Sequence, residues 1–482
     1  MALTIRGGRV FHGDPVVERP GALVLEAGVV CARSEASCSG ARGAEPGVGE
    51  GGRDGEGGRD GDGGRGGRGR DGAGGKDGGG GRDEVIDATG CLVLPGFVIA
   101  HHHLYSSLAR GMPGPSAPPR SFVEVLERVW WRLDRALDGE LSEQSALAGT
   151  LEALSCGVTG IVDHHASPSF VESSLDRIAR GVARAGGRAV VCYEATDRHG
   201  DEGFRRGVAE NARMLERVRG GGAGDHVRAM VGGHAPFTLS DAHLAELAAL
   251  ARRHDVALHL HVAEAAHDQV DARARGAADV TERLSRAGVL DGEALLAHGV
   301  HLSASELERI AASRAVLTHQ PRSNMNNHVG YLGGARSMGQ RLALGTDGIN
   351  GDLFDEAHAA FFRLREHDAA GAAETVWSWL AGGWRVLSRA FGLPPERGFG
   401  RLDEGCPADV VVLDYDGATP LHAGSLPWHL AFGMSARNVR DVIVNGEVVV
   451  RAREPVRVRK DEALKETRSA AERLWARMAE LA

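Results

Sequence analysis

Eight apolar segments alternate with helical segments between residues 95 and 400, and this alternation constrains the fold more than any other feature. Residues 158–165 and 256–264 are typical of buried strands, whereas residues 121–138 and 241–255 repeat apolar side chains at helical spacing. Strands that alternate with helices predict an α/β fold, and eight such units fit a (β/α)8 barrel of the TIM type. The periodicity alone leaves an open parallel sheet as the alternative.

Short strand patterns at both ends of the chain predict a second, smaller domain. Apolar residues alternate in residues 1–40, 84–94 and 401–456, and Asn445-Gly446 is a hairpin signal. We therefore expect a small β-sandwich assembled from both termini around a barrel at residues 95–400. A C-terminal helix is expected in residues 457–482, where Leu, Ala and Trp recur at helical spacing.

Residues 41–83 differ from everything around them, because they consist mostly of Gly, Arg and Asp. Such a tract offers almost no apolar surface to offset its ordering entropy, so we expect a disordered insert. A glycine-arginine tail that binds RNA is the alternative. The acidic residues cancel much of its positive charge, however, and the tract has no aromatic residue for base stacking.

Charge and cysteine content argue against several classes of protein. The formal net charge is -9 at pH 7, and no Lys/Arg block lies outside residues 41–83, so we expect no nucleic acid partner. The six cysteines form no C-x-x-C pair, which disfavours a disulfide framework and a cysteine zinc site and favours a reduced, cytoplasmic setting. No apolar run reaches the roughly 18 residues that span a membrane, and we expect no secretory signal at the N-terminus.

Histidine and carboxylate side chains follow nearly every predicted strand, at the end where α/β barrels place their catalytic residues. In chain order they are His101, His102, His103, Asp163, His164, His165, Glu194, His234, His261, Glu264, His298, His319 and Asp347. A purely structural barrel does not need this pattern, so we interpret it as a metal site.

His101 and His103 are two residues apart on a strand, so both side chains lie on one face and His102 lies on the other. His261 can supply a third nitrogen and Asp347 an oxygen. This set suits one divalent ion, Zn²⁺ most readily and Fe²⁺ as the alternative. His259 competes with His261 because both face the same way, but His261 lies nearer the strand end.

Several motifs resemble the amidohydrolase superfamily. They are Pro95-Gly96 before His101-x-His103, His-Val-Ala-Glu at residues 261–264, Ala-His-Gly around His298 and Gly-Thr-Asp-Gly around Asp347. Within it, the chain is similar to the cytosine/guanine deaminase and triazine chlorohydrolase branch. It most resembles the aminohydrolases of the SsnA type in HLYSSLARGM, WWRLDRALD, DHHASP, GGHAPFT, RSNMNNHVGY and LALGTDG. The resemblance covers almost the whole chain except the Gly-rich tract.

The resemblance implies roles for individual residues. His101, His103, His261 and Asp347 would bind one metal, because the lysine that bridges two metals in relatives is absent beside His234. The resemblance also implies that Asp347 accepts a proton from the attacking water, that Glu264 is the general acid/base, and that His298 orients the metal-bound hydroxide. The alternatives are that Glu264 only orients a ligand histidine and that His298 is structural.

The substrate side of the site is less constrained. His234 is expected to contact the substrate, or else to be structural, and Arg322, Asn324 and His328 either recognise substrate or satisfy loop backbone groups. His164 and His165 fit pocket lining and buried packing equally, and His319 is interpreted as structural. Trp130 and Trp131 are interpreted as core residues, although one could form a wall of the pocket.

These features predict a metal-dependent aminohydrolase that cleaves a non-peptide carbon–nitrogen bond, most simply by deaminating a small heterocycle. Hydrolysis of another leaving group, such as a halide or a ring amide, is the enzymatic alternative. A catalytically idle accessory member of the family is the other alternative. The expected partner is a small heterocyclic substrate, and a homodimer is compatible with the sequence.

Overall fold

A computed structural model describes residues 2–19, 21–31 and 84–481. The predicted insert at residues 41–83 lies outside this part of the chain. Among the described residues, no helix combines the length and apolar character needed to cross a bilayer.

The middle of the chain alternates parallel strands with helices, as the sequence predicts. Two parallel sheets have the strand orders β11-β10-β9-β8 and β12-β13-β14-β15-β16. Isolated parallel bridges join His102 to Asp347 and Ala195 to Gly233, so residues of one sheet contact residues of the other at two places. The strands are β8 (Phe97–His102), β9 (Val158–His165), β10 (Arg188–Tyr193), β11 (Val227–Ala229), β12 (Val231–Gly232), β13 (Leu258–Val262), β14 (Ala294–His298), β15 (Val316–His319) and β16 (Leu342–Leu344).

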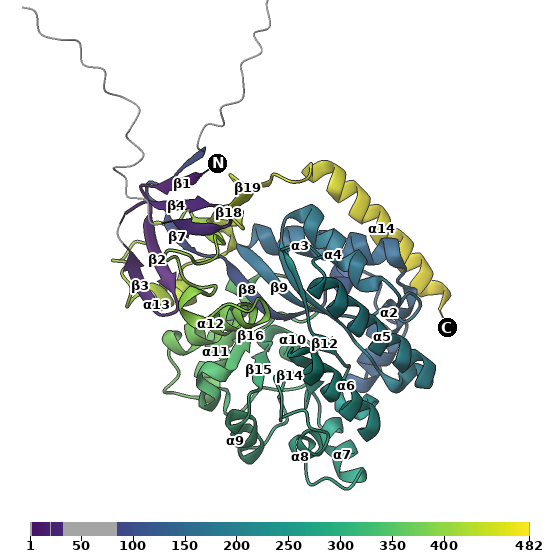
Figure 1. Cartoon of the computed structure of the whole chain (residues 1–482). Helices are drawn as coiled ribbons and strands as arrows, with labels where there is room; N and C mark the ends of the chain where they lie inside the picture. The colour runs from purple at the N-terminus through teal and green to yellow at the C-terminus, as the bar shows by residue number, and fades with distance from the viewer. Residues whose placement is uncertain (1, 20, 32–83, 482) are drawn as a thin grey trace, which may run out of the picture.

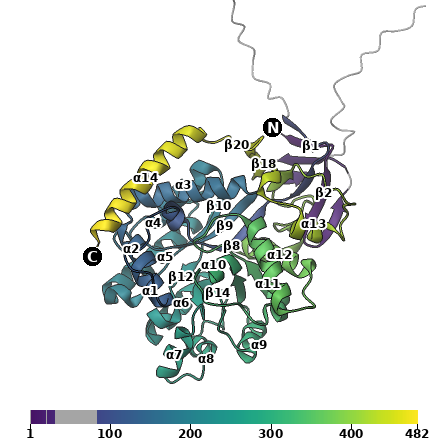
Figure 2. The same cartoon turned by 180° about the vertical axis from the view of Figure 1, so that it is seen from behind.

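Helices lie around these strands in both views (Figures 1 and 2). They are α3 (Gly139–Ser155), α4 (Ser174–Ala185), α5 (Gly200–Arg219), α6 (Asp241–His254), α7 (His267–Ala274), α8 (Val280–Arg286), α9 (Ala304–Ala312), α10 (Pro321–Asn326), α11 (Leu353–His367) and α12 (Ala373–Ala390). The expected N-caps are present: Ser240 caps α6, and Ser303 with Glu306 forms a capping box on α9. On α12, a Cβ atom at Gly382 or Gly383 would lie 2.2 or 2.3 Å from a carbonyl oxygen of β16 or β8, so these glycines let the helix pack closely on the sheet.

The predicted strand at residues 91–102 is in fact two strands. β7 (Leu92–Pro95) pairs with the terminal strand β17 (Val410–Leu413), whereas β8 pairs with β9. The chain changes sheets at Gly96, where a Cβ atom would lie only 2.2 Å from the Thr159 side chain. Close packing at this position therefore separates the two strands that apolar periodicity had joined.

Strands from both ends of the chain form two further sheets beside each other (Figure 1). One has the order β5-β4-β1-β6 and the other β20-β19-β18-β17-β7-β2-β3. Ile5 and Leu25 of the first sheet and Val410 and Ile443 of the second belong to one hydrophobic cluster, so the sheets share a core. The remaining strands are β1 (Leu3–Arg6), β2 (Arg9–Gly13), β3 (Val16–Arg19), β4 (Leu23–Glu26), β5 (Val29–Cys31), β6 (Glu84–Asp87), β18 (Val439–Val444), β19 (Glu447–Arg451) and β20 (Glu454–Pro455). The β-sandwich remains our interpretation of this arrangement.

The other helices lie outside this alternation. They are α1 (Phe122–Val125), a π-helical turn (Leu126–Trp130), α2 (Trp131–Ala136), α13 (Leu426–Phe432) and α14 (Lys460–Glu480). Helix α14 lies in the range expected for a C-terminal helix and runs along the outside of the molecule near α2 and α3 (Figure 1). Its Ala470 and Leu474 are buried against the first helical segments after β8.

Candidate metal centre and pocket

A pocket of about 820 Å³, counted to its open mouth, lies at the C-terminal ends of the parallel strands. Its polar lining includes His103, Glu194, His234, His261, Glu264 and Asp347. Its apolar wall includes Phe122, Leu126, Trp130, Trp131 and Phe237.

The side chains of β8 alternate as the sequence predicts. His101 and His103 point toward the histidine cluster, whereas His102 forms a 2.8 Å hydrogen bond with Thr346 Oγ1 outside it. All three histidines are buried. The strand therefore presents two imidazoles to one place.

The four predicted metal ligands lie together. His103 Nε2 is 3.1 Å from His261 Nε2 and 3.0 Å from Asp347 Oδ1, and His101 Nε2 is 3.5 Å from the same oxygen. Ligands about 2.0 to 2.1 Å from a tetrahedral zinc ion are separated by about 3.3 Å. These three separations are thus close to those expected around one ion, and a ring nitrogen of His298 also lies within 4.8 Å of ligand atoms of His101, His261 and Asp347.

The hydrogen bonds of the two histidines at the pocket surface fix which nitrogen is free. His103 Nδ1 donates to the His164 carbonyl at 2.6 Å, and His261 Nδ1 donates to the His234 carbonyl at 3.0 Å, because a carbonyl can only accept. In the neutral imidazoles, each Nε2 then carries a lone pair toward the shared space.

His101 is fixed through a third histidine. His101 Nδ1 pairs with His259 Nε2 at 2.9 Å, and His101 Nε2 is buried without a hydrogen-bond partner among the described residues. His259 therefore lies behind His101 and supports it, while His261 lies at the pocket. The sequence favours His261 over His259 as the pocket residue because His261 lies nearer the strand end, and the structure has this arrangement.

Asp347 dominates the electrostatics of the cluster. Burial lowers the pKa of His103, but the hydrogen bond and charge of Asp347 outweigh it and raise this pKa to about 9. The hydrogen bonds and charges of the surrounding histidines hold the pKa of Asp347 well below its usual value despite burial, which raises it. A metal cation competes with a proton for the same Nε2 atom, so metal binding here would release protons.

The backbone is strained at two positions of the cluster. Asp347 has a φ of 53° and His298 a φ of 77°. Residues other than glycine rarely adopt this left-handed backbone conformation. Such conformations cost on the order of 1–3 kcal/mol and cluster at functional sites. The strain supports a functional role for this end of the strands.

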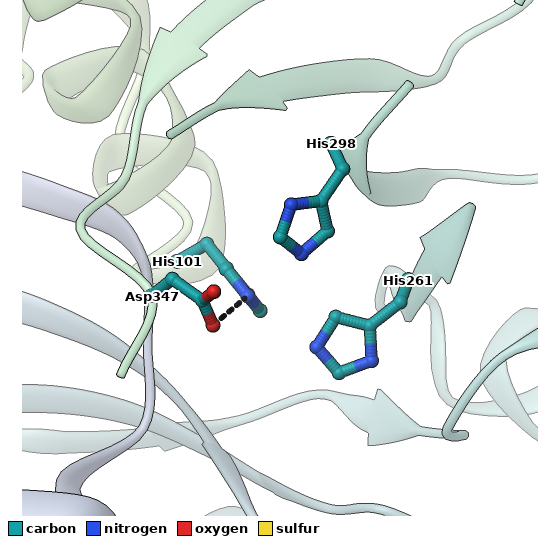
Figure 3. Close-up of side chains that lie close together, drawn as sticks. All are labelled: His101, His261, His298 and Asp347. Carbon is teal, nitrogen blue, oxygen red and sulfur yellow. Dashed lines mark ion pairs between the residues drawn. The ribbon is translucent and has the colours of Figure 1, made fainter. Parts of the chain in front are cut away.

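Glu264 and His298 form a pair beside the ligand set. His298 Nε2 is 3.4 Å from Glu264 Oε2, and Asn327 Nδ2 donates to Glu264 Oε1 at 3.2 Å. Burial raises the pKa of Glu264 well above its usual value and lowers that of His298. Figure 3 shows His298, His261, His101 and Asp347 turned toward a common space from different strands.

Only one of the four residues expected to bind substrate lines the pocket, and it is His234. Arg322 is instead held by the buried Glu356, at 2.6 Å from Nε, and by Asn350. The Asn324 side-chain oxygen accepts a hydrogen bond from His298 Nδ1 at 3.0 Å, and His328 is exposed outside the pocket. Arg322 and Asn324 on helix α10, and His328 just after it, therefore lie outside the pocket lining, a local geometry that the motif alone does not specify.

Trp130 and Trp131 are both partly exposed and line the pocket, so the alternative of a pocket wall describes them better than the core. Trp130 also packs against a buried hydrophobic cluster. The two tryptophans flank the end of a π-helical turn, a feature that often marks functional sites. His165 and His319 are buried outside the pocket lining. His164 is also buried, packed beside His101, His103 and His261, so packing describes it better than pocket lining.

Two supporting residues were missed. Ser323 Oγ donates a short hydrogen bond to Asp347 Oδ2, and Asn327 contacts Glu264. Both lie in the Arg-Ser-Asn-Met-Asn-Asn-His segment that the sequence had singled out, so the segment was the signal although its contacting residues were not identified.

Comparison with known proteins decides the family. The model of the amidohydrolase family matches residues 92–449, which is most of the chain. The chain belongs to the amidohydrolase family. The resemblance predicted from its motifs is therefore confirmed.

Relatives within the amidohydrolase family align over most of their length. The chain is 31% identical over 402 residues to a 5-methylthioadenosine/S-adenosylhomocysteine deaminase of Desulforudis audaxviator, covering 81% of this chain and 89% of that protein. It is 30% identical over 380 residues to a 5'-deoxyadenosine deaminase of Methanothermobacter thermautotrophicus, covering 77% and 84%.

Solved structures have the same fold. An adenosine deaminase from Xanthomonas campestris with bound zinc superposes with a TM-score of 0.76 at 22% identity over 98% of both chains. The atrazine chlorohydrolase of Arthrobacter aurescens, complexed with zinc, gives 0.73 at 20% identity over 97% of this chain and all of that one. These findings confirm a TIM-barrel type α/β domain and a metal-dependent aminohydrolase that acts on a carbon–nitrogen bond other than a peptide bond.

Proposed function

We propose that this enzyme hydrolytically deaminates an amino-substituted nitrogen heterocycle, with one divalent ion bound by His101, His103, His261 and Asp347. The observation that carries the proposal is the convergence of these four side chains at a pocket that the buried Glu264 also lines, with His101 buried directly behind it. The proposal includes closure of the two parallel sheets into one barrel through the bridge between His102 and Asp347.

The donor set fits zinc, with iron as the alternative. Three imidazole nitrogens and one carboxylate oxygen are ligands that both metals accept, and the buried, unpartnered His101 Nε2 is a nitrogen that a cation would satisfy. A divalent ion held there would lower the pKa of a water molecule from about 15.7 toward 7 and so supply a nucleophile at neutral pH.

The chain's own residues handle the protons. Asp347 would hold the metal through Oδ1, which lies beside His103 Nε2, so Oδ2, which accepts from Ser323, is the oxygen left to receive a proton from the attacking water. Glu264, whose pKa burial raises well above its usual value, donates its proton to the ring nitrogen beside the carbon under attack. It then takes the proton of the added hydroxyl as the carbonyl forms and passes it to the departing amine, and the proton held by Asp347 restores Glu264 for the next cycle. His298, whose Nδ1 donates to Asn324, presents Nε2 as an acceptor that orients the water.

The pocket wall suits a flat ring. Phe122, Trp130, Trp131 and Phe237 provide apolar surface around the polar floor, and they would limit the access of bulk water. His234 lies on this wall as a substrate contact. The deaminase relatives make 5'-modified adenosines the first substrates to test.

The test is a paired measurement on the full chain. Metal per chain is measured by inductively coupled plasma mass spectrometry. Ammonia release is then followed with 5-methylthioadenosine, S-adenosylhomocysteine, 5'-deoxyadenosine, free amino-purines and amino-pyrimidines, and chloride release with a chlorotriazine. We expect about one ion per chain and ammonia from at least one amino heterocycle. A protein loaded with metal that releases chloride but no ammonia would contradict deamination.

A cytoplasmic location and a homodimer remain predictions.

A further inference from the structure

Glu194 is a buried carboxyl group at the pocket that the proposed mechanism does not use. It directly follows β10, lines the pocket and is 4% exposed. One of its carboxylate oxygens lies within 4.8 Å of ligand nitrogens of His103, His164 and His261. Glu194 is therefore close to the position where the reacting carbon would lie.

His234 presents a hydrogen-bond acceptor next to Glu194. The Thr238 hydroxyl donates to the Ala235 carbonyl at 3.0 Å, so its oxygen accepts from His234 Nδ1 at 2.7 Å. In the neutral imidazole, His234 Nε2 is then a bare acceptor. It lies 3.6 Å from Glu194 Oε1.

Glu194 is poorly satisfied by its neighbours. Its closest side-chain contacts are Arg198 Nη2 at 3.4 Å, His164 Nδ1 at 3.5 Å and His234 Nε2 at 3.6 Å, near or beyond the limit of a hydrogen bond. Arg198 makes its shorter bond to Asp134, at 3.1 Å, and its guanidinium stacks 4.6 Å from the centre of the Trp131 ring. Glu194 Oε1 thus has one long hydrogen bond, from Arg198, and also faces the acceptor nitrogen of His234.

We propose that Glu194 is a specificity-determining residue, which together with His234 accepts hydrogen bonds from a ring N–H beside the carbon under attack. This inference rests on the proposed deamination. A pair of acceptors at Glu194 and His234 would select a particular class of heterocycle. In this class, the ring nitrogen on one side of the carbon under attack carries hydrogen, and the ring nitrogen on the other side receives the proton of Glu264. In adenine the amino-bearing carbon lies between an acceptor nitrogen and a fused ring carbon without hydrogen, so the ring offers no N–H at this position.

The test uses two probes that differ in one group. Isocytosine has a ring N–H between its amino-bearing carbon and its carbonyl, and its derivative methylated at that nitrogen does not. Dissociation constants on metal-loaded protein are measured by calorimetry, and kcat/KM by ammonia release. The variants are Glu194→Gln and, as a matched surface control, Glu216→Gln, whose side chain is 59% exposed.

We expect the wild type and the control to bind isocytosine at least about 10-fold more tightly than its methylated derivative. Glu194→Gln should weaken isocytosine binding by about 10- to 100-fold, the worth of a hydrogen bond to a charged group, and should change binding of the methylated probe less than about 3-fold. Metal content should stay at that of the wild type. His234→Gln provides the same test if Glu194→Gln does not fold.

Three results would overturn the inference: equal losses for both probes, no binding of isocytosine by the wild type, or loss of metal in Glu194→Gln, which would make Glu194 a ligand. Binding that depends on Glu194 without ammonia release from any probe or substrate would support the inference and count against deamination. The failure of one proposal is thus distinguishable from the failure of the other.

Discussion

The two ends of β10 bury charged groups in opposite ways. At the N-terminal end, Arg188 Nε and Nη2 donate to Asp409 at 2.9 and 3.0 Å, and Nη2 also donates to Asn445 at 2.8 Å. At the C-terminal end, the Glu194 carboxyl group has side-chain contacts of 3.4 to 3.6 Å. The first site is nearly closed to solvent, with side chains 5% and 2% exposed, and the second faces the pocket.

This contrast separates a structural buried charge from a functional one. Arg188 and Asp409 satisfy each other and join the barrel strands to the terminal β region, so their burial needs no further group. The cluster at the other end leaves His101 Nε2 and His298 Nε2 without hydrogen-bond partners among the described residues. Buried polar atoms that converge on one space beside a pocket fit a ligand, and we propose a cation there. Parallel α/β barrels generally bind ligands at the C-terminal end and use the N-terminal end for stability.

Replacing Asp347 by Ala should have the largest effect and remove metal and activity together. The variant loses the carboxylate that spans His101 and His103, so ammonia release should fall below about one thousandth of the wild-type rate. Metal analysis and ammonia release on the same preparation check this, with the exposed Asp355→Asn as control. Full metal content in Asp347→Ala would remove Asp347 from the ligand set.

Glu264→Gln should separate proton transfer from metal binding. The amide keeps the shape of the side chain but cannot cycle a proton, so kcat should fall by about 10²- to 10⁴-fold while metal content stays constant. Steady-state kinetics with metal analysis checks this. Near-normal kcat would reduce Glu264 to a residue that orients its neighbours.

Arg188→Met should affect stability rather than chemistry. The buried Asp409 loses its counter-ion, which should lower the free energy of unfolding by about 3–5 kcal/mol and leave kcat per folded molecule unchanged. Urea unfolding measures the first and titrated active enzyme the second. The double variant Arg188→Met/Asp409→Leu should regain most of the stability, and if it stays as unstable as the single variant, the loss has another origin.

Asn324→Ala should have the smallest effect. Asn324 fixes the orientation of His298 through a 3.0 Å hydrogen bond and does not line the pocket, so kcat should fall by about 10-fold with KM nearly constant. Kinetics at saturating substrate tests this. A change confined to KM would restore the original expectation that Asn324 contacts substrate.

The gathering of the candidate metal ligands and of Glu264 at one end of the strands was predictable because strand geometry fixes it. Alternation on β8 places His101 and His103 on one face, and the ends of parallel strands meet at one edge. Arg322, Asn324 and His328 were not predictable in this way, because they lie on or just after α10, where direction depends on local helix geometry and on Glu356. The division of residues 91–102 into two strands was missed for a similar reason, since it depends on packing of Gly96 against Thr159.

The central claim is that one cation is held by three imidazole nitrogens and one carboxylate oxygen. Crystals of zinc-loaded protein, measured on both sides of the zinc absorption edge, test it directly. We predict one strong anomalous peak per chain, bounded by His101 Nε2, His103 Nε2, His261 Nε2 and Asp347 Oδ1. A peak instead among His164, Cys192 and His259, the buried cluster behind this set, would contradict it.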